Sequence, residues 1–95
     1  MPNYGSWTWV EAPPQLLTDE EPVRAAARKA GYTGQLMIRL DVGAEGTPEH
    51  VRVESPAFLA NVPDVMEAIG AWRFRPAIRA GKQATVPMEL GIDVF

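Results

Sequence analysis

The chain has 95 residues and a formal net charge of −3, with no cysteine and one histidine. This length limits it to a single small domain with short extensions. The absence of thiols excludes disulfide bonds, cysteine nucleophiles and zinc sites with thiolate ligands, and a single histidine excludes a histidine-only metal cluster. The negative charge disfavours nucleic acid as a partner. No apolar run approaches the roughly 20 residues that span a bilayer, and no signal peptide opens the chain. We therefore expect a soluble domain, which would be part of a longer protein if it works at a membrane.

Residues 1–17 are predicted to form an extended N-terminal segment in front of a folded domain at residues 18–95. The Pro13-Pro14 pair prevents a helix in this segment, and Trp7 and Trp9 alternate with smaller residues. The two tryptophans could form a platform for a ligand, but we favour packing over an edge of the core.

A short amphipathic helix is predicted to follow this segment. Thr18 and Glu21 have the spacing of a capping box, and Gly31 is a suitable stop for the helix. Between them, apolar residues recur at helical spacing and form a narrow stripe of small side chains that can lie close to a sheet: Val23, Ala26, Ala27 and Ala30.

The hydrophobic period then changes to two. Residues 35–42 and 51–54 alternate between apolar and polar side chains, which predicts an antiparallel hairpin around a turn at residues 43–46. One face of this hairpin is expected to be buried. The other is polar and exposed to water, and it includes His50, which we interpret as an ordinary surface residue.

A second helix is predicted after the hairpin, with Asn61 as its N-cap. Its core-facing stripe follows helical spacing: Val62, Val65, Met66, Ile69 and Trp72. The last strand alternates up to Val94 and contains Pro87. Because proline cannot donate to a strand ladder, this strand should lie at the edge of its sheet.

These elements predict an α+β fold in the order α-β-β-α-β. Three strands would form an antiparallel sheet with two helices packed on one face, and the extended N-terminal segment would precede them.

Two motifs in this order resemble the C-terminal domain family of TonB, the periplasmic energy transducer of Gram-negative bacteria. The first is Ala27-Arg28-x-x-Gly31-x-x-Gly34, followed by the alternating strand and the turn glycine Gly46. The second is Trp72-Arg73-Phe74-x-Pro76-Ala77, followed by Gly81-Lys82 and an alternating terminal strand. The resemblance spans residues 22–95. The family's hydrophobic residue after the turn glycine is Pro48 here, which implies a late start of the second strand.

The resemblance implies an adaptor rather than an enzyme. In the family, an N-terminal transmembrane helix engages the ExbB–ExbD proton-driven motor. The C-terminal domain grips the TonB box, a short segment of outer-membrane transporters, and supports uptake of siderophores or cobalamin. By this resemblance the chain is the soluble, periplasmic, receptor-gripping end of an inner-membrane-anchored protein. No cofactor, metal or catalytic residue is implied.

An exposed edge strand suits such a grip, because an extended peptide can pair with its open backbone groups. The predicted partner-binding edge comprises Ala84, Thr85, Val86, Pro87, Met88, Glu89, Leu90, Gly91 and Ile92. A basic cluster lies next to it in the sequence and could pair with an acidic partner segment: Arg73, Arg75 and Arg79.

Two other interpretations remain open. A domain of this fold could be the interaction module of an envelope sensor or assembly complex, and its open edge could pair with its own copy in a strand-exchanged homodimer. Catalysis is the least expected function, because the serines lack a paired base and no glycine-rich phosphate loop occurs. Trp72 and Phe74 are expected in the core rather than at a recognition surface.

Overall fold

The computed structural model describes residues 10–95 and has the predicted α+β fold. Trp7 and Trp9, with the first part of the predicted lead-in, lie outside the described residues. The two α-helices are α1 (Glu21–Lys29) and α2 (Pro63–Gly70), and a 3₁₀ helix, η1, covers Ala57–Asn61. The three long strands are β2 (Gly34–Val42), β3 (Pro48–Ser55) and β7 (Val86–Val94). Four short strands complete the fold: β1 (Gln15–Leu16), β4 (Phe74–Arg75), β5 (Ala77–Arg79) and β6 (Lys82–Ala84).

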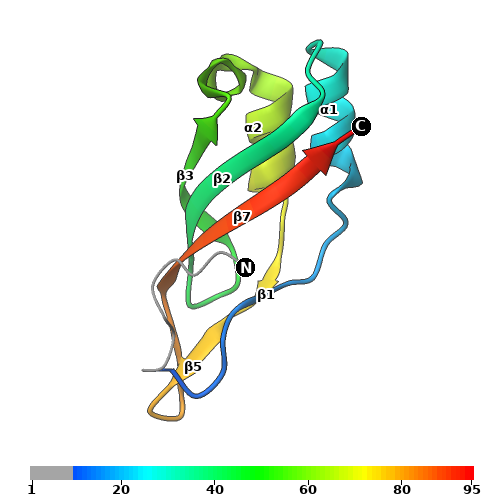
Figure 1. Ribbon diagram of the computed structural model, residues 1–95. Helices are drawn as coiled ribbons and strands as arrows, with labels where there is room; N and C mark the ends of the chain where they lie inside the picture. Colours follow the sequence, from blue (N-terminus) through cyan, green and yellow to red (C-terminus); the bar gives the residue numbers. More distant parts are fainter. Residues whose placement is uncertain (1–9) are drawn as a thin grey trace.

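The long strands form an antiparallel sheet in the order β3-β2-β7. Figure 1 shows α1 and α2 on the same side of this sheet. The predicted arrangement of three strands and two helices on one face is therefore confirmed.

The core lies between this sheet and the helices. Every second residue of β2 from Leu36 to Val42 is buried, as the alternating pattern predicts. Val23 and Ala27 face it from α1, and Val65 and Ile69 from α2. Trp72 and Phe74 are buried as well, with their rings edge to face at 6.2 Å, so they are core residues as expected.

Both predicted helix caps are wrong. The N-cap of α1 is Glu20 and has no side-chain cap bond, because the Thr18 hydroxyl instead accepts a hydrogen bond from the backbone N–H of Arg73 at 3.1 Å. The N-cap of α2 is Val62, since Asn61 is the last residue of η1. A tertiary contact thus takes the predicted cap of α1, and the preceding 3₁₀ helix includes the predicted cap of α2.

The second strand of the hairpin does not start late. β3 begins at Pro48, which pairs with Val42 of β2. A hydrogen bond of 2.8 Å from the backbone N–H of Gly43 to the Thr47 carbonyl closes the turn before β3.

The short strands form two small sheets that the hydrophobic pattern did not predict. β1 pairs with β4, which ties the described part of the lead-in to the segment after α2. β5 and β6 form a hairpin, and Ala12 bridges to Ile78 of β5. Within residues 10–95, no helix is both long enough and apolar enough to cross a membrane.

Candidate partner-binding edge

β7 lies at one edge of the three-stranded sheet, and β3 lies at the other. β7 pairs with β2 over nine consecutive residue pairs without a register shift, from Gly34 opposite Val94 to Val42 opposite Val86. Among residues 10–95, no strand pairs with the other side of β7. β7 is therefore an edge strand, as Pro87 predicts.

The direction of the backbone groups along β7 follows from the register. In a regular strand, successive residues direct their N–H and C=O groups to opposite sides. Gly43, directly after β2, donates to Thr47, directly before β3, so the odd-numbered residues of β2 face β3 and the even-numbered ones face β7. The register pairs even residues of β2 with even residues of β7. The odd-numbered residues of β7 consequently direct their backbone groups away from the sheet.

Two features of β7 agree with this assignment. The carbonyl oxygen of Asp93, an odd-numbered residue, accepts a hydrogen bond from Arg24 Nε of α1 at 3.0 Å, so it is turned toward a group outside the sheet. Pro87 is odd-numbered too. Its missing donor therefore falls on the outer side, where the β2–β7 ladder does not need it.

This geometry divides the nine predicted edge residues. Ala84 belongs to β6 and pairs with Ala77, while Thr85 lies between β6 and β7 and accepts a hydrogen bond from the backbone of Ala44. Within β7, the even-numbered residues direct their N–H and C=O groups toward β2. Glu89 and Gly91 are the central residues whose N–H and C=O groups both point outward. This alternation was not predicted from the sequence, although Pro87 could have indicated it, because a strand proline must face away from its ladder.

The C-terminal end of β7 is held by α1, which the sequence did not predict. Arg24 donates to the Asp93 carbonyl and lies 5.7 Å from the centre of the Phe95 ring. Arg28 Nη1 donates to the Phe95 carbonyl at 3.1 Å. Glu20 orients Arg24 through an ion pair of 2.6 Å. Arginine side chains of α1 therefore limit how far a partner strand can pair along the outer side of β7 toward its C-terminal end.

The two edges of the sheet differ in regularity. β3 has two register shifts against β2, starts with Pro48 and contains His50 at a φ of 51°. Bulges and prolines of this kind hinder the pairing of a further strand. β7 has no register shift, so it is the edge better suited to accept one.

The three arginines of the predicted basic cluster lie neither on β7 nor on its neighbour β2. Arg73 precedes β4, and its guanidinium donates to the carbonyls of Trp72 at 2.7 Å and Gly70 at 3.3 Å, at the end of α2. Arg75 is in β4 and donates to Gln15 Oε1 of β1 at 3.3 Å. Arg79 ends β5, opposite Lys82. The structure places them along the segment that leads from α2 to the β5–β6 hairpin.

Within residues 10–95, no group of three or more acidic or histidine side chains is arranged to hold a metal ion. Beside the C-terminal end of β7, Arg24 of α1 forms an ion pair with Glu20. The arrangement around β7 can therefore act through backbone pairing and surface charge.

Comparison with protein-family models gives no match for this sequence, and comparison with curated proteins gives none either. Among solved structures, the chain is similar to the C-terminal domain of TonB from Pseudomonas aeruginosa, determined by NMR in solution. The TM-score is 0.58 and the sequence identity 19%, over 90% of this chain and 88% of that one. At this identity the likeness shows a shared fold. The predicted resemblance is confirmed at that level.

Proposed function

We propose that this domain is a TonB-like adaptor of the periplasm, which binds the TonB box of outer-membrane transporters by strand addition to β7. In this role it would be the soluble end of an inner-membrane-anchored protein, coupled to an ExbB–ExbD motor through parts outside this chain, and would support uptake of siderophores or cobalamin. The observation that carries the proposal is the unbroken register of β7, with the outward backbone groups of Glu89 and Gly91 at its centre.

Strand addition suits an adaptor with several partners. The hydrogen bonds of the added strand come from the main chain, so they impose little demand on the partner's sequence. A force applied along the strand would load these bonds together, which favours the transmission of a pull from the domain to the partner.

The length of the edge sets the length of the bound segment. Thr85 is tied to Ala44 at one end, and Arg24 occupies the Asp93 carbonyl at the other. The stretch of β7 between them, Val86 to Ile92, has seven residues and suits a partner segment of up to about seven residues, since each strand residue adds about 3.3 Å on both strands.

An NMR titration of the ¹⁵N-labelled domain with TonB-box peptides tests the proposal. We expect shifts centred on the amides of Glu89 and Gly91 that saturate at one peptide per domain, together with slower hydrogen exchange of these two amides. A folded, monomeric domain that shifts with none of the peptides, or shifts only along β3, would contradict it. The interaction module of an envelope sensor or assembly complex would then be the better interpretation.

The same edge supports one alternative, a strand-exchanged homodimer. An unbroken edge strand can pair with its own copy about a two-fold axis. Sedimentation at increasing protein concentration detects such a dimer by its larger size. A dimer that forms through β7 would also compete with the peptide and weaken its apparent affinity.

A further inference from the structure

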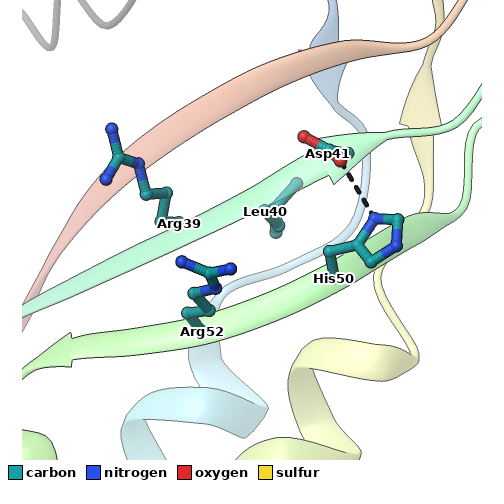
Figure 2. A pocket seen from close by; sticks show the side chains of 5 residues that line it. All are labelled: Arg39, Leu40, Asp41, His50 and Arg52. Atoms are coloured by element: carbon teal, nitrogen blue, oxygen red, sulfur yellow. Dashed lines mark hydrogen bonds and ion pairs between the residues drawn. The ribbon is translucent and has the colours of Figure 1, made fainter.

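The sheet face that points away from the helices carries a hollow of about 350 Å³ between β2 and β3. It is lined by Arg39, Leu40, Asp41, His50 and Arg52, and Figure 2 shows the two arginines on neighbouring strands at one end with the Asp41–His50 pair at the other. This hollow is separate from the outward edge of β7.

The two arginines are direct neighbours across the strands. Arg39 and Arg52 are register partners in the β2–β3 ladder, and like charges placed opposite each other in this way destabilise a sheet. Arg39 Nη1 forms an ion pair with Glu54 at 3.2 Å. The exposed side chain of Arg52 makes no hydrogen bond or ion pair with any residue in 10–95. One positive charge at this end of the hollow is therefore not balanced by a neighbouring carboxylate.

A β-bulge sets the other end of the hollow. Asp41 lies opposite Glu49 and Arg39 opposite Arg52, so β3 has one residue more than β2 in between. His50 lies in this bulge at a φ of 51°, a conformation that is uncommon for residues other than glycine. Its Nδ1 is 3.0 Å from Asp41 Oδ2. Since a carboxylate accepts hydrogen bonds, Nδ1 is the donor, and the second carboxylate oxygen of Asp41 remains an acceptor.

The hollow thus presents a cationic position, Arg39 with Arg52, and an acceptor position, Asp41. Arg39 and Asp41 are two residues apart along β2, which corresponds to about 6.6 Å. Arg52 lies directly opposite Arg39 on β3, so the cationic position is about one such step along the strands from Asp41. An extended peptide presents its residues i and i+2 on one face at the same spacing. We propose that this hollow binds an extended segment of a protein partner in which an acidic residue and a basic residue are separated by one residue.

The charge arrangement favours such a segment over an inorganic anion. A phosphate or sulfate ion offers only acceptors to the hollow, and the carboxylates of Asp41 and Glu54 would repel it. A glutamate on the partner can pair with the Arg52 guanidinium in a bidentate manner, while a lysine two residues away pairs with Asp41. This binding uses a different face from strand addition to β7, so it stands whether or not the proposed function is correct.

The test uses a blocked pentapeptide of sequence Gly-Glu-Gly-Lys-Gly, titrated into the whole ¹⁵N-labelled domain at low salt. We expect weak binding, with shifts at the Arg52 Nε–H group and in the His50 ring. Arg52→Gln should weaken the peptide about threefold to fivefold, in the range of an exposed ion pair. Asp41→Asn should weaken this peptide but not its Gly-Glu-Gly-Gln-Gly counterpart. Lys82→Gln is the matched control, because it removes one exposed positive charge from the β5–β6 hairpin and should change nothing.

Three results would overturn the proposal. The first is an equal loss of affinity in Arg52→Gln and Lys82→Gln, which would mean general charge attraction. The second is unchanged binding in an Arg52→Gln variant whose spectrum shows a folded domain. The third is tighter binding of inorganic phosphate than of the peptide, with displacement of the peptide, which would make the hollow a simple anion site.

Discussion

Gly46 lies directly against the backbone of Phe74. The N–H of Phe74 donates to the Gly46 carbonyl at 2.8 Å, and a Cβ atom on Gly46 would lie 2.3 Å from the Phe74 carbonyl oxygen. Gly46 also has a φ of 85°. This contact joins the β2–β3 turn to the segment that follows α2, so it holds the sheet and β4 together.

Gly46→Ala should therefore destabilise the domain by at least about 2 kcal/mol. Alanine is strained at a positive φ, and its Cβ atom would clash with main-chain atoms of Phe74. Urea unfolding followed by circular dichroism measures the change. Gly81→Ala is the control, since Gly81 also has a positive φ of 76° but no atom within 4 Å of an added Cβ. Equal losses in the two variants would show that the contact with Phe74 contributes nothing.

A substitution in the loop of the β5–β6 hairpin should raise the stability of the domain. Ala80 and Gly81 connect Arg79 to Lys82, and both have positive φ, 52° and 76°. A two-residue loop of this kind is a type I′ turn, which favours asparagine over alanine at its first position. Ala80→Asn should raise the free energy of unfolding by about 0.5–1 kcal/mol. A stability equal to or below that of the parent would rule out this turn type.

Arg24 should set the end of the binding edge on β7. Arg24→Ala frees the outward carbonyl of Asp93, at a cost of about 1 kcal/mol for the lost hydrogen bond. If a peptide adds to β7, its footprint should then extend to the Asp93 amide in an NMR titration. Arg28→Ala, which removes the neighbouring arginine but leaves the Asp93 bond intact, should not extend it. The same footprint in both variants would contradict this role of Arg24.

The basic cluster provides a separate test of partner charge. If Arg73, Arg75 and Arg79 attract an acidic receptor segment, Arg75→Glu should weaken an acidic peptide about twofold to fivefold at low salt and less at high salt. Fluorescence anisotropy at two ionic strengths measures both values. Lys29→Glu, on the exposed side of α1, is the charge-matched control. An effect independent of salt would exclude these arginines from the binding surface.

The sequence predicts those parts of the fold that depend on periodicity. The alternation from Leu36 to Val42 and the helical stripe of Val65 and Ile69 locate the core, because burial on one face is what these periods require. Short-range signals predict less well. Thr18 has the spacing of a cap, but its hydroxyl binds the backbone of Arg73, 55 residues away. No local pattern reveals such a partner.

The candidate edge was predicted as a run of nine residues, but not which of their backbone groups point outward. Which of its backbone groups point outward depends on the register set by the Gly43–Thr47 turn. Pro87 predicted the edge position of the strand, but the alternation of its backbone groups was not predicted from it. The contact of Arg24 with Asp93 joins residues 69 positions apart and follows only from the packing of α1 against the end of β7.

The most direct measurement is the affinity of a TonB-box peptide for Glu89→Pro. This substitution removes an outward N–H and leaves the β2–β7 ladder intact, so we expect a folded domain that has lost at least about tenfold in affinity. Glu89→Ala removes the same side chain but keeps the N–H, and it should bind like the parent. The backbone N–H of Met88 faces β2, so Met88→Pro should instead lower the thermal stability of the domain. Unchanged binding by a folded Glu89→Pro variant would contradict strand addition to β7.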